Sequence, residues 1–135
     1  MIAALAAAPV SFLASSALVS LVEVLFPVAM PSGGWAQVEE SVSVGKMVYA
    51  LSVAPILENL LLWGVIALLG KFLRGCCLIS ALAALSSTLI HVLASGEAAY
   101  IAVFPGFFFM GLLILRAERR ATGYWLSVVH HVAIN

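Results

Sequence analysis

The sequence predicts an all-α membrane protein, built as one bundle of four or five transmembrane helices. Of its 135 residues, 64% are apolar and 9% are charged, and the mean hydropathy is +1.19. Soluble domains average about 45–50% apolar and about 25% charged residues, and a small domain leaves much of its surface exposed. The apolar excess must therefore face lipid. Because a backbone in lipid has to satisfy its own hydrogen bonds, each apolar run is expected to be a helix.

Five apolar stretches give the order of the expected helices: residues 2–30, 47–70, 76–95, 99–115 and 121–135. The complete runs are near the ~20 residues that cross about 30 Å of hydrocarbon, and the fifth is shorter. A polar loop over residues 31–46 follows the first run, and its Pro-Ser-Gly-Gly start is a stop signal. We therefore divide one membrane domain into a first transmembrane helix with an external loop, residues 1–46, and a core, residues 47–135.

The basic residues predict the orientation. Five of the six lie in two turns: Lys71 and Arg74 in one, and three arginines within residues 116–120 in the other. Those turns share a side in any alternating topology. The positive-inside rule places both in the cytoplasm, together with the N-terminus. The net charge is zero, so no basic surface for nucleic acid is expected.

Four polar residues stand out within the apolar runs: Glu58, His91, His131 and Asn135. Burying an ionisable side chain at the bilayer centre costs about 2.5–3.5 kcal/mol on insertion scales, so such residues are functional candidates by default. Glu58 lies midway along the second run, and Asn59 beside it adds a second polar group.

The third run places His91 on a face of small residues. Ala83, Ser87 and His91 are spaced by four, and Ala84 and Thr88 flank them. Small residues let a neighbouring helix approach closely. We therefore expect His91 to point into the bundle.

In the last run, His131 and Asn135 are also spaced by four and share a face. The adjacent His130 points about 100° away from them, since a helix turns through that angle at each residue. It is expected near the edge of this face.

Glu58, His91 and the His131–Asn135 pair, in this order on three helices, resemble the CaaX-protease and bacteriocin-processing family of Abi-type intramembrane endopeptidases. That family carries a Glu-Glu-x-x-x-Arg motif, then Phe-x-x-x-His, then His-x-x-x-Asn or Asp. The resemblance covers residues 47–135.

This chain departs from the family pattern at three positions. Asn59 stands in place of the second glutamate, Trp63 in place of the arginine, and Ser87 in place of the phenylalanine. The four residues to which the family's chemistry is ascribed are present, whereas these supporting residues differ.

The resemblance implies hydrolysis of a peptide bond in a membrane-embedded or lipid-anchored protein or peptide. Glu58 and His91 would activate water, while His131 and Asn135 would hold the oxyanion. No cofactor is implied. The expected location is the cytoplasmic membrane of a bacterium or archaeon.

Three alternatives stay open. Glu58, His91 and His131 form a two-histidine, one-carboxylate set that suits hydrolytic zinc, although the chain has no His-Glu-x-x-His motif. A glutamate-type enzyme is favoured over this metal-dependent one. The second alternative is an inactive family relative that acts as a membrane scaffold. The third is a small proton-coupled transporter whose Glu and His carry protons.

Overall fold

The computed structural model describes residues 2–25, 44–96 and 98–134, and the regular elements in these ranges are helical. They are α1 (Ile2–Leu25), α2 (Val44–Val48), the π-helix η2 (Tyr49–Val53), α3 (Ala54–Leu69), α4 (Cys76–Ser95), the 3₁₀-helix η3 (Ala98–Val103), α5 (Phe104–Arg116) and α6 (Arg120–Ile134). The all-α prediction is confirmed for these residues. Of the loop expected at 31–46, the last three residues begin α2, and the rest lies outside the described ranges.

Helices α2, η2 and α3 form one continuous rod, and Pro55 explains the π-helical segment within it. Proline has no N–H, so the regular helical bond to the carbonyl four residues earlier is lost. Just before it, the Ala54 N–H bonds to the Tyr49 carbonyl, five residues back. The wider turn absorbs the missing donor and lets the rod continue into α3, which carries Glu58.

Glycines set both ends of α4. Gly75 precedes the helix with φ 104°, and Gly96 follows it with φ 74°. Residues with a Cβ rarely adopt either conformation. The Gly96 N–H also donates to the Val92 carbonyl oxygen at 2.9 Å and closes the last turn. These two positions fix the length of the helix that carries His91.

The apolar core lies between α3, α4 and α5. Its buried members are Leu62, Ile66, Ile79, Ala83, Ala84, Phe107, Met110 and Ile114. The predicted inward face of α4 is confirmed, since the alanines in this set and the neighbouring Ser87 and Thr88 are all buried. Helix α6 also approaches α5 closely, and Gly123 permits this because it has no side chain. A Cβ at Gly123 would lie 2.7 Å from the Ile114 Cα.

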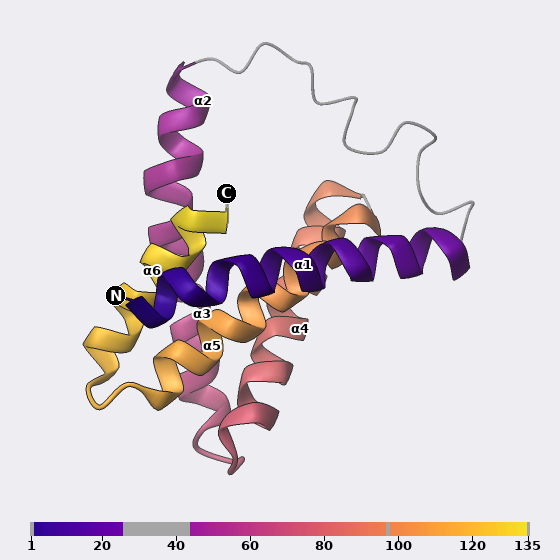
Figure 1. Ribbon diagram of the computed structural model, residues 1–135. Helices are drawn as coiled ribbons and strands as arrows, with labels where there is room; N and C mark the ends of the chain where they lie inside the picture. The colour runs from indigo at the N-terminus through magenta and orange to yellow at the C-terminus, as the bar shows by residue number, and fades with distance from the viewer. Residues whose placement is uncertain (1, 26–43, 97, 135) are drawn as a thin grey trace.

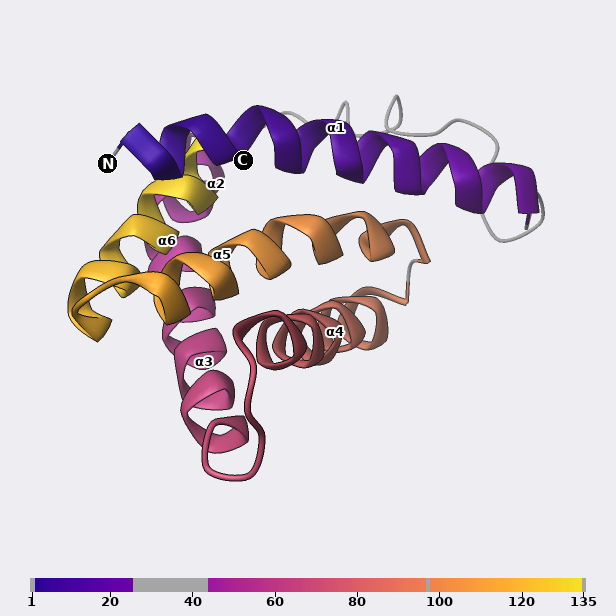
Figure 2. The same cartoon turned by 60° about the horizontal axis from the view of Figure 1, so that its bottom comes forward.

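Helix α1 packs on α5, α6 and η3. In Figure 2, α5 lies between α1 and α4, so these three helices form successive layers. In both views α1 runs across the direction of the α2–α3 rod (Figures 1 and 2). The described helices therefore do not all run parallel or antiparallel to one another, as they would in a simple bundle.

Three segments are long and apolar enough to cross a membrane: Ala4–Val22 in α1, Leu51–Leu69 in the α2–α3 rod, and Cys76–Ser95 in α4. The apolar helix over Tyr100–Arg116 is shorter. Of the four or five spans expected, the described residues thus provide three by length and composition.

Candidate active site

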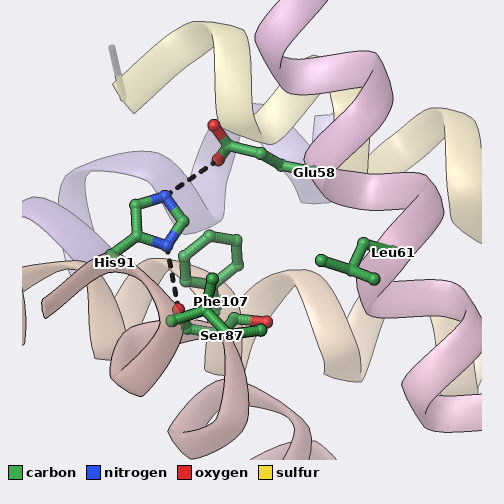
Figure 3. Close-up of a pocket in the computed structure, with 6 residues that line it drawn as sticks. Glu58, Leu61, Ser87, His91 and Phe107 are labelled. Atoms are coloured by element: carbon green, nitrogen blue, oxygen red, sulfur yellow. Dashed lines mark hydrogen bonds and ion pairs between the residues drawn. The ribbon is translucent and has the colours of Figure 1, made fainter. Parts of the chain in front are cut away.

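Three helices bring Glu58, His91 and His131 together. The Glu58 side chain on α3 has its Oε2 atom 3.4 Å from His91 Nε2 on α4 and 3.5 Å from His131 Nε2 on α6. Figure 3 shows the Glu58 carboxylate and the His91 ring pointing toward each other. The structure therefore joins three of the four predicted site residues, which lie far apart in the sequence. Asn135 lies outside the described residues.

The hydrogen bond at the far side of the His91 ring defines its orientation. Nδ1 lies 2.8 Å from the Ser87 carbonyl oxygen, which can only accept, so Nδ1 carries a proton. In a neutral imidazole the Nε2 atom is then bare, and its lone pair faces Glu58. Phe107 on α5 packs on the same ring, with centroids 5.2 Å apart, and holds it in place.

His131 has the opposite arrangement of protons. The Asn59 Nδ2 atom lies 2.7 Å from the Pro55 carbonyl oxygen and 3.0 Å from His131 Nδ1. Because a carbonyl only accepts, the amide nitrogen must occupy this place, and its two hydrogens serve the two neighbours. His131 Nδ1 is therefore an acceptor, and Nε2–H points at Glu58.

One carboxylate oxygen thus faces a proton donor and a proton acceptor. His131 offers an N–H to Glu58 Oε2, whereas neutral His91 offers a lone pair, so one further proton fits between Glu58 and His91. Both distances exceed the usual 2.7–3.2 Å of an N–H···O bond. Catalytic hydrogen bonds often tighten only when substrate binds. This arrangement allows Glu58 and His91 to take up a proton together.

A small cavity adjoins this proton-sharing pair. It has a volume of about 20 Å³ and is lined by Glu58, Leu61, Ser87, Ile90, His91 and Phe107 (Figure 3). A single water needs about 10–15 Å³ by this measure. Glu58 and His91 contribute to the lining, but the surface that faces the cavity is almost entirely apolar. The cavity therefore has the volume of about one water and lies next to Glu58 and His91.

No family model, no curated protein and no solved structure matches this chain.

The same three residues are those that a hydrolytic zinc ion would use. His91 suits that role, because its Nδ1–H bond to a carbonyl leaves a bare Nε2. His131 does not, because its Nδ1 accepts from Asn59 and the proton therefore lies on Nε2. A protonated ring nitrogen has no lone pair to give to a metal. The hydrogen bonds of the site do not fit the zinc alternative.

Sequence reasoning underestimated Asn59 and His130. Asn59 is completely buried, whereas the Glu58 side chain remains 32% exposed. The stripe of buried residues on α3, Pro55, Asn59, Leu62 and Ile66, repeats every three or four positions. This helical spacing can be seen in the sequence, and it predicts that Asn59 faces the interior of the protein.

The expectation that His130 lies near the edge is wrong. Its side chain is fully buried, with Nδ1 3.0 Å from the Ala4 carbonyl oxygen and Nε2 3.0 Å from the Ser11 hydroxyl. Both partners belong to α1. His130 thus ties α6 to α1, while His131 faces the site.

Proposed function

We propose that this chain is an integral membrane protein. Its buried polar residues are Ser11, Asn59, Ser80, Ser87, Thr88, Ser127, His130 and His131, whereas its outer surface carries many large apolar side chains. Leu93 and Phe72, for example, are 74% and 79% exposed. Buried hydroxyl, amide and imidazole groups, together with large apolar side chains on the outer surface, suit a protein solvated by lipid rather than by water.

The proposed orientation has the two basic turns in the cytoplasm. This orientation is supported by the positive-inside rule alone. In Figure 1 the α3–α4 connection lies at the bottom and the α5–α6 connection at the lower left, but in Figure 2 the α5–α6 connection lies well above the α3–α4 connection. Helix α1 runs across the direction of the α2–α3 rod, so the cytoplasmic N-terminus inferred from helix counting gains no support from the fold.

We further propose that the chain is a glutamate-type intramembrane endopeptidase. The observation that carries this proposal is the contact of one Glu58 oxygen with two histidines of opposite protonation, beside a cavity for one water. Water in this cavity would give a proton to the Glu58–His91 pair as its oxygen attacks the peptide carbonyl, and the pair would pass that proton to the leaving amine when the C–N bond breaks. His131 Nε2–H would then stabilise the developing oxyanion, with Asn135 as the second donor in analogy to the family.

The proposed substrate is a membrane-embedded or lipid-anchored protein or peptide. One face of α3 is exposed and apolar, and it consists of Leu57, Leu60, Leu61, Gly64, Val65 and Leu68. Leu61 also lines the cavity beside Glu58. A hydrophobic segment or chain lying against this face would therefore end close to the candidate site, as a substrate approaching from lipid must.

The test is cleavage by the protein reconstituted in proteoliposomes with fluorogenic peptides that carry a transmembrane segment or a prenyl anchor. Glu58→Gln should lower the cleavage rate at least ~10²-fold, since Gln keeps the shape but cannot accept the proton from water. Glu118→Gln is the matched control, because Glu118 is exposed in the turn between α5 and α6.

Each alternative predicts a different result. A scaffold with the same fold would give no cleavage with any of the peptides. A proton-coupled transporter would move protons across the vesicle membrane, and Glu58→Gln would abolish that flux. Cleavage that persists in Glu58→Gln would remove Glu58 as the general base.

A further inference from the structure

Asn59 is a fully buried amide on α3, next to Glu58 in the sequence but directed at α6. Its Nδ2 group donates to the Pro55 carbonyl within its own helix and to His131 Nδ1 across the helix interface. Its Oδ1 atom has no hydrogen-bond partner among the described residues. The contacts that Asn59 makes are therefore those of its amide hydrogens.

A neutral histidine has one ring proton, and the partner at one nitrogen decides where that proton lies. The Asn59 donor makes Nδ1 the acceptor and leaves Nε2–H directed at Glu58. The Pro55 carbonyl prevents the amide from turning over, because the Asn59 oxygen would then face another acceptor at 2.7 Å. The orientation of Asn59 is thus fixed by a partner that does not titrate.

We propose that Asn59 is a positioning residue that holds His131 as the Nε2–H tautomer, with its proton aimed at the site. The catalytic consequence rests on the proposed function, since only that tautomer presents a donor to an oxyanion. With the proton on Nδ1, the lone pair of Nε2 would repel the developing negative charge.

A second contact between the same helices supports this role. One turn after Asn59, the Trp63 ring packs on Tyr124 of α6 with centroids 6.3 Å apart. The Tyr124 hydroxyl also donates to the Ile56 carbonyl oxygen at 3.0 Å. These contacts fix the register of α6 on α3 without using the Asn59 amide. His131 is therefore placed by the helix packing, and Asn59 is left to determine its protonation.

The direct test is ¹⁵N NMR of the full chain labelled with ¹⁵N-histidine in lipid vesicles, with the His131 signals assigned from His131→Gln. The shift of each ring nitrogen reports whether it carries a proton. We expect a bare Nδ1 and a protonated Nε2 in the wild type. A wild-type His131 with its proton on Nδ1 would overturn the proposal, whatever the activity.

Two variants test the dependence on the amide. Asn59→Asp keeps the shape, but a buried carboxylic acid has only one proton, which the Pro55 carbonyl would accept, so an oxygen acceptor is left for His131 and Nδ1 should become protonated. Asn59→Leu removes both donors and should give a mixture of tautomers. Ser127→Ala is the matched control, because this buried α6 hydroxyl donates to the Tyr124 carbonyl of its own helix. An unchanged His131 spectrum in both Asn59 variants would contradict the proposal.

Kinetics with a prenylated fluorogenic peptide in the same vesicles give the second measurement. Loss of one oxyanion donor lowers kcat roughly 10²–10³-fold. We expect Asn59→Asp to lower kcat by about this factor while KM stays nearly constant, and the Ser127→Ala control to change neither. A tautomer change without any change in kcat would refute the positioning role. If the wild type cleaves no peptide, the proposed function fails, and the NMR result still decides the tautomer.

Discussion

His130→Ala tests whether α1 is fastened to α6 as the structure indicates. The buried imidazole bonds to the Ala4 carbonyl and the Ser11 hydroxyl, both at 3.0 Å. Each lost hydrogen bond costs about 1 kcal/mol, and large-to-alanine changes in a packed interior cost about 2–5 kcal/mol. In the variant, the Ala4 carbonyl and the Ser11 hydroxyl can form hydrogen bonds within α1. We therefore expect a loss in the lower half of the range of about 2–5 kcal/mol. The free energy of unfolding should fall by about 3 kcal/mol.

The assay is equilibrium unfolding in detergent micelles, arranged as a double-mutant cycle with Ser11→Ala. The cycle should give a coupling energy of about 1 kcal/mol between His130 and Ser11, since the two side chains share one hydrogen bond. Ser16→Ala on the same helix is the control. Its hydroxyl is exposed and bonds to the Phe12 carbonyl of its own helix, so the unfolding free energy should stay near the wild-type value.

A His130→Ala protein within about 0.5 kcal/mol of the wild type, with no coupling to Ser11, would refute this account of α1 docking. A substitution at His130 disturbs the position of α6 itself, so it cannot serve as a control for His131 variants. Val132→Ala is a suitable control, because Val132 is on the same helix and 38% exposed.

Three further predictions test the orientation, the site and the helix packing. Reporter fusions in the α3–α4 and α4–η3 connections should give opposite signals, cytoplasmic for the first; the reverse would overturn the orientation. His131→Ala and Asn135→Ala should each lower kcat roughly 10²–10³-fold with little change in KM. Variants with the same kcat as the wild type would refute the role of these residues in stabilising the oxyanion. Gly123→Ala should lower the free energy of unfolding by about 1–3 kcal/mol, because the new Cβ would lie 2.7 Å from the Ile114 Cα. The control is Gly64→Ala, whose Cβ would meet nothing within 4 Å and which should leave the free energy of unfolding unchanged.

The helices and the inward face of α4 were predictable because they depend on local information. Glycine and proline positions, run lengths and the four-residue spacing of Ala83, Ser87 and His91 act within one segment. The meeting of Glu58 with both histidines was also anticipated, through the family resemblance. No spacing within a single helix contains that information.

The crosswise course of α1 and the burial of His130 were not predictable in this way. Periodicity shows that a helix has two faces, but it does not show which neighbour covers each face. On α6, His131 faces Glu58 and Asn59 of α3, while His130, about 100° around the helix, faces α1. Both histidines are buried because α3 and α1 pack on different sides of α6, and this follows only from the tertiary arrangement.

Three residues, Asn59, Trp63 and Ser87, differ from the motifs of the family that the site residues resemble. Two of them, Asn59 and Trp63, lie one turn apart on α3, and each contacts α6: Asn59 at His131 and Trp63 at Tyr124. Both residues thus belong to the interface between α3 and α6, although the buried Asn59 Oδ1 atom has no hydrogen-bond partner among the described residues.

The third departure, Ser87, has a related explanation. Its carbonyl accepts the Nδ1–H bond that orients His91, a role that any residue at this position can fill. The aromatic ring that the family pattern carries four residues before the histidine is absent there, yet Phe107 from α5 packs on His91 with centroids 5.2 Å apart. Ser87 and Phe107 line the same cavity, so the smaller side chain and the ring from another helix share one space. The proposed function requires both histidines to keep these orientations, and the contacts of Asn59, Ser87 and Phe107 hold them there.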